Sequence, residues 1–313
     1  MHSIVDRRQF VKTAAMGALA GVSMGVMGSK GAAAAEPDVN QDKSSAARLI
    51  PGCCAYSYDH DLKSGAMTLE DFILKAVELR LAAVDITAYY LKSTEPKYLH
   101  SLRQLAYKHA VAFSGSACGA SMVQGDAAKR ADSLNQIKKW VDVTEVLGAS
   151  HLRIFAGELP QGASVKDAIG WVVESMKVAC DYAGEKGIIL GLENHEGVTQ
   201  TADVCLEIMR RVNSPHAGIN LDITNFIATP TQGAYAQIAA CIPYATNIHI
   251  RDHFYDHTPV DMDRVWQIFA RAGHQGYVSA EYEASFADSL PSATGVPKLV
   301  GEIQRLCKRY SSV

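Results

Sequence analysis

Short apolar runs recur along the chain from Ile50 to its C-terminus, and each run is too brief to form a helix. Apolar runs of this length are typical of strands that are buried on both faces of a parallel sheet. Eight of these runs are predicted strands: Pro51–Tyr56, Ala83–Thr87, Ala110–Ser114, His151–Phe155, Ile188–Glu193, Ala217–Asp222, Thr246–Arg251 and Tyr277–Glu281.

The segments between these runs show the 3.6-residue spacing of amphipathic helices. One apolar stripe covers residues 69–77, and Thr68 with Asp71 three residues later has the spacing of a capping box. A second stripe covers residues 171–179, in a helix that we expect to end at Lys186-Gly187. The same pattern continues in Asp203–Val212, Tyr235–Ile242, Met262–Ala272 and Pro297–Tyr310.

This alternation of strands and helices indicates an α/β fold. Eight strand–helix units in about 260 residues match the size of a (β/α)8 barrel. A doubly wound open sheet also alternates strands and helices, but no G-x-G-x-x-G motif follows an early strand, so the usual phosphate-binding signature of that fold is missing. We therefore predict a single-domain (β/α)8 TIM barrel over residues 49–313.

The first 35 residues have the features of an export signal and are set apart from the fold. Arg7-Arg8 precedes an apolar run that is rich in glycine and alanine, and Ala33-Ala34-Ala35 offers small residues for cleavage. The paired arginines resemble the twin-arginine motif, although Asp6 stands where that motif usually has Ser or Thr. We predict a twin-arginine-type signal over residues 1–35 and a polar, disordered linker over residues 36–48.

Such a signal predicts a periplasmic or otherwise exported protein. An uncleaved membrane anchor is the alternative, but the apolar run is short and glycine-rich for a membrane span, so no stable membrane insertion is expected after cleavage. The chain is 48% hydrophobic and 20% charged, which is typical of globular proteins.

Charge and cysteine content narrow the range of partners. Removal of residues 1–35 takes away four basic side chains and one acidic side chain, which leaves 26 basic and 32 acidic side chains and a balance of −6. Nucleic acid is therefore not an expected partner, because phosphate binding requires a basic surface. The seven cysteines include no C-x-x-C pair, so we expect them to be small apolar core residues.

Metal-binding residue types stand at or near the ends of the last four predicted strands. They are Glu193, Asp222, His249 and Glu281, in strands five to eight. Their successive gaps of 29, 27 and 32 residues correspond to about one strand–helix unit each. All strands of a TIM barrel run the same way, so these side chains are expected side by side at the C-terminal rim, where such barrels carry their active sites.

Alternation within the seventh strand supports this geometry. Asn247, His249 and Arg251 share one face of the strand, and the isoleucines between them lie on the other face. Because side chains alternate with a period of two, the polar residues are expected to point into the barrel mouth.

Three carboxylates gathered there would repel one another and raise one another's pKa. A divalent cation removes that cost, and three oxygen ligands with one imidazole suit Mn²⁺, Mg²⁺ or Co²⁺, with Zn²⁺ as a further alternative.

Several short motifs carry a resemblance to a known family. They are Gly191-Leu-Glu-Asn-His195, Asn220-Leu-Asp222, Asn225-Phe226, His249-Ile-Arg-Asp252 and Gly276-Tyr-Val-Ser-Ala-Glu-Tyr-Glu283. Through them the chain, from about residue 50 to residue 310, resembles the sugar phosphate isomerase/epimerase family, which consists of xylose isomerase-like TIM barrels. The resemblance implies that one divalent metal is bound by Glu193, Asp222, His249 and Glu281. It also implies that the two glutamates exchange protons with the substrate carbon. Many members have His where this chain has Asn225.

Such a site predicts proton abstraction from a carbon next to a carbonyl. A metal ion would polarise the carbonyl of a ketose or keto-sugar and stabilise an enediolate, while Glu193 and Glu281 would remove and return the proton. We predict a divalent-metal-dependent sugar isomerase or epimerase that holds one metal ion, with Mn²⁺ as the first choice and a small carbohydrate as its partner.

Three further residues on predicted inward faces are candidates for substrate contact. They are His195, Arg251 and Arg153. The structural alternatives are a solvated loop histidine and arginines held in ion pairs. Glu283 shares its parity with Glu281 and is the alternative fourth ligand.

Other functions use the same features. The same metal and base would serve a lyase or dehydratase that acts on a keto-sugar or a 3-keto-glycoside, and an exported sugar-binding protein would need only the pocket. A multi-zinc endonuclease shares the fold but would need a basic groove. For the oligomeric state, a homo-oligomer is one alternative.

Overall fold

The structure is a computed structural model that describes residues 46–284 and 289–311. The predicted signal over residues 1–35 lies outside the described residues, as does the predicted linker as far as residue 45. Within the described part of the chain, no helix has both the length and the apolar character that a membrane crossing needs.

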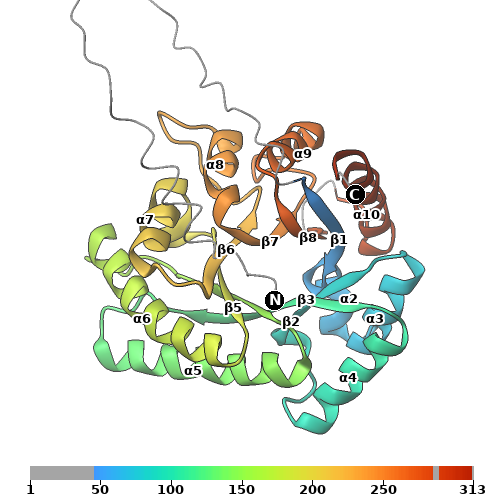
Figure 1. Cartoon of the computed structure of the whole chain (residues 1–313), viewed down its shortest axis with the longest axis horizontal. Helices are drawn as coiled ribbons and strands as arrows, with labels where there is room; N and C mark the ends of the chain where they lie inside the picture. Colours follow the sequence, from blue (N-terminus) through green and yellow to red (C-terminus); the bar gives the residue numbers. More distant parts are fainter. Residues whose placement is uncertain (1–45, 285–288, 312–313) are drawn as a thin grey trace, which may run out of the picture. The chain divides into compact units, whose positions relative to one another are not determined.

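Eight parallel strands close into a barrel in chain order, and β1 pairs with both β2 and β8 (Figure 1). The strands are β1 (Arg48–Cys54), β2 (Ala83–Thr87), β3 (Ala112–Ser121), β4 (His151–Phe155), β5 (Ile189–Glu193), β6 (Ala217–Asp222), β7 (Ala245–Ile250) and β8 (Gln275–Ala280). The predicted (β/α)8 TIM barrel is confirmed.

Helices follow the strands and surround the barrel (Figure 1). They are α2 (Asp59–Ser64), α3 (Leu69–Glu78), α4 (Pro96–Lys108), α5 (Ala127–Leu147), α6 (Val165–Glu185), α7 (Ala202–Val212), α8 (Ala234–Cys241), α9 (Met262–Arg271) and α10 (Ser292–Tyr310). Short 3-10 turns η1 (Ala55–Tyr58), η2 (Ala88–Tyr90), η3 (Gly197–Thr199) and η4 (Ile242–Tyr244) lie between them.

Local sequence signals explain several helix ends. Thr68 and Asp71 form the predicted capping box at the start of α3, since each side chain bonds the backbone N–H of the other. Helix α6 ends at the predicted place, because Gly187 takes a left-handed φ of 69° that a residue with a side chain would avoid. Helix α10 begins five residues before the predicted start and includes Pro297 in its second turn.

Two strands, β1 and β3, depart from the predicted bounds by three residues or more, and β5, β7 and β8 differ by one or two. Strand β3 runs to Ser121, seven residues beyond the predicted end. The prediction stopped too early because the second half of the strand consists of small residues without a clear apolar pattern. Its predicted first residue, Ala110, has a φ of 56° and belongs to the turn after α4. Strand β1 starts at Arg48, so the last predicted linker residue is in the barrel, while Tyr56 falls in η1.

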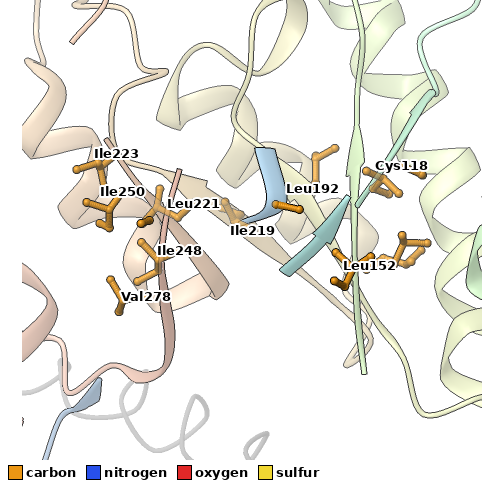
Figure 2. Packing of buried hydrophobic residues seen from close by; sticks show 14 of the residues in the cluster. Cys118, Leu152, Leu192, Ile219, Leu221, Ile223, Ile248, Ile250 and Val278 are labelled. Carbon is orange, nitrogen blue, oxygen red and sulfur yellow. The ribbon is translucent and has the colours of Figure 1, made fainter. Parts of the chain in front are cut away.

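The core lies between the strands and the helices. Apolar side chains that alternate with inward polar ones on β6 and β7 form part of this layer, including Ile219, Leu221, Ile248 and Ile250 (Figure 2). Each such burial contributes roughly 1.5–3 kcal/mol. The helices thus cover one face of every strand, and the polar residues are left to line the barrel interior.

Candidate metal centre

Three carboxylates meet at the C-terminal rim of the barrel. Glu193 and Asp222 are the last residues of β5 and β6, and Glu281 follows the last residue of β8. One oxygen from each lies within 4.8 Å of the others, and all three side chains are buried. The one-unit spacing in the sequence therefore corresponds to proximity in the fold.

His249 adjoins this cluster through Glu281. Its Nδ1 lies 3.2 Å from Glu281 Oε1, and its Nε2 lies 3.3 Å from Asp85 Oδ2 on the other side of the ring. Cys54 Sγ also approaches Glu281 Oε1, at 3.7 Å. His249 therefore borders the three carboxylates through Glu281, but it forms a separate group with Cys54 and Glu281 and is not part of the group of Glu193, Asp222 and Glu281. Glu281, and not Glu283, is the glutamate of β8 that belongs to the cluster.

Two buried arginines lie against the carboxylates. Arg153 Nε is 3.0 Å from Glu193 Oε2. The Arg251 guanidinium reaches Asp222 Oδ2 at 3.3 Å and Glu281 Oε2 at 2.9 Å, and it extends to Glu283 at 3.5 Å. Both arginines therefore lie in the site as the strand parity predicts, and both hold carboxylates in place.

The electrostatic environment gives Glu193 and Glu281 different pKa values. Burial raises the pKa of the Glu193 carboxyl to about 7; Arg153 opposes this shift, and the negative charge of Glu281 adds to it. Burial alone would also raise the pKa of Glu281, but the positive charges of His249 and Arg251 outweigh it and hold that pKa well below its usual range. Near neutral pH, Glu193 is thus ready to exchange a proton while Glu281 is ionised.

The cluster fits a divalent cation. Glu193 Oε2 and Asp222 Oδ2 are buried and have no hydrogen-bond donor among the described residues, since the facing arginine N–H groups approach them without hydrogen-bond geometry. Arg153 and Arg251 compensate the charge of these oxygens, and a divalent cation would bind the lone pairs that are left without a hydrogen bond. Oxygen ligands with one imidazole suit Mn²⁺, Mg²⁺, Co²⁺ or Zn²⁺.

Asp85 is a site residue that sequence reasoning missed. It lies fully buried on β2, where its Oδ2 accepts a hydrogen bond from Asn247 Nδ2 at 2.9 Å and faces His249. Asn247 also donates to Asn220 Oδ1 at 3.0 Å. The available signal was an aspartate in the middle of the short strand Ala83–Thr87, between Val84 and Ile86.

Two asparagines brace the strand ends. Asn194 Nδ2 donates to the Asp222 carbonyl at 2.8 Å, and its Oδ1 accepts from the Asp222 N–H at 2.9 Å. Asn225, which departs from the family pattern, directs its Nδ2 toward Glu193 Oε1 at 3.4 Å. The departure therefore falls next to a carboxylate of the cluster.

His195 lies outside the cluster. Its ring packs against Phe155, with centroids 4.5 Å apart, and its Nδ1 is 3.9 Å from Glu196. Burial lowers the pKa of the imidazole, so the ring is neutral near pH 7. The structure thus puts His195 on the wall of the mouth, at a distance from the carboxylates that Arg153 and Arg251 touch.

Comparisons with known proteins agree with this fold. Residues 73–304 match the family described as xylose isomerase-like TIM barrel. No curated protein matches the chain by sequence. The solved structures described next are less than 25% identical to this chain, so they bear on the fold alone.

Three of these structures illustrate the likeness. A D-allulose 3-epimerase from Methylomonas sp. in complex with D-allulose is 19% identical, with a TM-score of 0.65 over 85% of this chain and 99% of that one. D-Psicose 3-epimerase with D-tagatose from Clostridium cellulolyticum H10 is 12% identical, with a TM-score of 0.67 over 84% and 98%. The IOLI protein with a bound zinc atom is 15% identical, with a TM-score of 0.66 over 84% and 100%.

Proposed function

The chain belongs to the xylose isomerase-like TIM barrel family, and from this premise we propose that it is a divalent-metal-dependent sugar isomerase or epimerase acting on a ketose or keto-sugar. The observation that carries the proposal is the buried cluster of Glu193, Asp222 and Glu281, two of whose oxygens lack a hydrogen-bond donor among the described residues. Such a cluster at the C-terminal rim is a site for a cation and a substrate oxygen.

Four residues would hold the metal: Glu193, Asp222, His249 and Glu281. When bound, the ion would act as a Lewis acid toward the carbonyl of the substrate. Mn²⁺ is the first choice for a set dominated by carboxylates, and Mg²⁺, Co²⁺ and Zn²⁺ are the alternatives. The zinc atom in the IOLI structure supports a divalent ion in this fold.

Proton transfer falls to the two glutamates. Arg251 holds Glu281 ionised, and a bound cation would do so in place of the His249 proton, because a metal-bound imidazole is neutral. Glu281 would therefore enter the reaction as a carboxylate that can accept the proton from the carbon next to the carbonyl. Glu193, whose pKa is raised to about 7, is suited to return a proton. The two residues lie on β5 and β8, and return from the opposite face of the enediolate would invert the carbon. Arg153 and Arg251 keep both carboxylates oriented.

The structural neighbours support this reaction class. Two of them are 3-epimerases, one in complex with D-allulose and one with D-tagatose. A lyase would use the same base on a substrate with a leaving group next to the carbanion, so the product distinguishes the two reactions.

The test is exchange of substrate C–H for solvent deuterium. Full-length or signal-cleaved protein, purified without added metal, is assayed for metal content and then incubated with free ketoses in D₂O, before and after chelation and with Mn²⁺ restored. We expect about one ion per chain, exchange followed by NMR, loss of exchange on chelation and its recovery with Mn²⁺. Unchanged turnover by metal-free protein would refute the proposal.

Export is a separate part of the proposal. The paired arginines and small-residue cleavage site of residues 1–35 support translocation of a folded protein by a twin-arginine route. Fusing residues 1–48 to a reporter checks this, and replacing Arg7-Arg8 with lysines should retain the reporter in the cytoplasm.

A further inference from the structure

A hollow of about 590 Å³ opens beside the carboxylate cluster. The segments after β5, β6 and β7 line it, and none of the three clustered carboxylates or His249 is part of its wall. Three wall residues touch the site: Asn225 contacts Glu193, Thr224 donates to Asp222 Oδ1 at 2.7 Å, and the Tyr255 hydroxyl lies 3.2 Å from Arg251 Nη1. The hollow is therefore space next to the reacting centre, which a sugar ring seated on the carboxylates would leave open.

The wall of this hollow is aromatic and exposed. Phe254, Tyr255 and Tyr235 contribute to it, and the rings of Phe254 and Tyr235 pack edge to face with centroids 5.8 Å apart. Tyr255 is 56% exposed and Ile227 is 48% exposed, so both side chains are accessible to a ligand in the hollow. Flat apolar walls with a few polar groups are typical of ligand pockets of about 300–1,000 Å³.

The charge of the wall points to a neutral ligand. Glu196 and Asp256 are its charged members, and no Lys or Arg is among the described residues that line it. Arg251, the nearest cation of the site, already contacts three carboxylates, and Arg264 stacks on the Tyr235 ring without lining the hollow. A phosphate would meet only acids here, whereas hydroxyl groups could donate hydrogen bonds to both carboxylates.

A second hollow, of about 430 Å³, shares Glu196 with the first. Phe155 and His195 form part of its wall, together with Glu158 and Glu196. It too lacks a lysine or arginine among its described lining residues. The mouth of the site is thus elongated, and Glu196 borders both hollows.

We infer that the hollow bounded by Tyr255, Phe254 and Ile227 is a subsite for a second sugar ring, and that the substrate is a neutral ketose or keto-sugar glycosylated by that ring. The inference rests on the proposed function, in which the first ring is bound at the carboxylates. The apolar face of the second ring packs on Tyr255 and Phe254, and its hydroxyls donate to Asp256 and Glu196.

Calorimetric titration of the Mn²⁺-loaded full chain tests this assignment. The probes are D-fructose, fructose 6-phosphate and two ketose disaccharides with different linkages, lactulose and isomaltulose. We expect at least one disaccharide to bind about 10-fold or more tightly than D-fructose, and the phosphorylated sugar to bind no more tightly than D-fructose. Equal affinity for all four, tighter binding of the phosphate, or no binding of any sugar would overturn the inference.

Variants of the wall show where the second ring lies. Tyr255→Ala should lower disaccharide affinity about 10-fold and D-fructose affinity less than 3-fold, and Ile227→Ala should act in the same direction more weakly. Tyr255→Phe keeps the ring and should preserve the preference. Tyr107→Ala, which removes an 86% exposed tyrosine on α4, is the matched control. Equal losses for both sugars in Tyr255→Ala would mean that the ring acts through Arg251, which contradicts a subsite.

The two proposals fail in different ways. Deuterium exchange into D-fructose or another free ketose without any preference for disaccharides would contradict the subsite alone. A disaccharide preference that depends on Tyr255, without exchange in any sugar, would support the subsite and contradict the catalytic proposal.

Discussion

The two ends of the barrel interior are built differently. At the C-terminal end, buried oxygens of Glu193 and Asp222 have no hydrogen-bond donor among the described residues. Toward the N-terminal end, space is filled tightly: a methyl group added at Gly218 would lie 2.2 Å from Thr246 Cγ2. One end keeps polar atoms available for a ligand, and the other uses close packing for stability, which is the usual division in TIM barrels.

An exception at the N-terminal side sharpens this contrast. His274, just before β8, is buried, and its Nε2 has no hydrogen-bond partner within the described part of the chain. Burial lowers the pKa of its imidazole to about 4, so the ring is neutral at physiological pH. An unsatisfied neutral nitrogen costs less than an unsatisfied carboxylate, and no cation is needed to accommodate it.

The largest effect is expected from Glu193→Gln at the C-terminal end. Gln keeps the volume but cannot return a proton, so deuterium exchange should fall by about 10²- to 10⁴-fold, and metal content should fall with it. Glu174→Gln, on the exposed face of α6, is the matched control and should retain both. Exchange within a factor of ten of the wild type, at equal metal content, would show that Glu193 has no catalytic role.

At the N-terminal side of the barrel, acid should lower the stability of the fold through His274. Its pKa is about 4 in the folded chain against 6.5 when unperturbed, so between these values the unfolded chain binds a proton that the folded chain does not. The free energy of unfolding should therefore fall by roughly 3 kcal/mol as pH drops from 6.5 to 4. Urea titrations of the wild type and His274→Leu measure this, and the variant should lose that part of the slope. An equal slope in both proteins would assign the pH dependence elsewhere.

Asp85→Asn tests the layer between the two ends. Asn keeps the shape but loses the charge that faces His249 Nε2 at 3.3 Å, so the imidazole is less firmly oriented toward the cluster. Metal affinity should fall by about 10- to 100-fold. Competition with a coloured chelator measures this directly. An unaltered affinity, with melting temperature lowered, would indicate a structural role alone.

The smallest effect is expected from glycine substitutions that contrast packed and open positions. Gly218→Ala introduces the clash with Thr246 and should destabilise the fold by about 1–3 kcal/mol. Gly170→Ala, in α6, meets no atom within 4 Å and should stabilise the helix by about 0.5–1 kcal/mol. Denaturant midpoints compare them, and similar values for both would argue against tight packing at Gly218.

Sequence periodicity predicted the part of the site that depends on one strand at a time. The inward positions of Arg153 and His249 follow from alternation, and the one-unit spacing of Glu193, Asp222 and Glu281 follows from the repeat. Both features are local, because each strand exposes every second side chain to the interior whatever its neighbours do.

Contacts between different strands could not be predicted from the periodicity of each strand. Asp85 and His249 are separated by 164 residues and meet because the closed barrel brings β2 and β7 face to face across its interior. Arg251 contacts both Asp222 and Glu281, and this contact depends on how neighbouring strands are staggered. The hollow beside Tyr255 depends in the same way on the neighbouring loops. The small residues of β3 left even its length undefined.

The sequence by itself therefore determined the barrel, the direction of the polar side chains and the rim on which they gather. The tertiary structure decided which of them touch, which oxygens lack a partner and where space remains for a ligand. The physical reason is that strand alternation and unit length are set within each βα unit, whereas the stagger that closes a barrel is the sum over all eight strands.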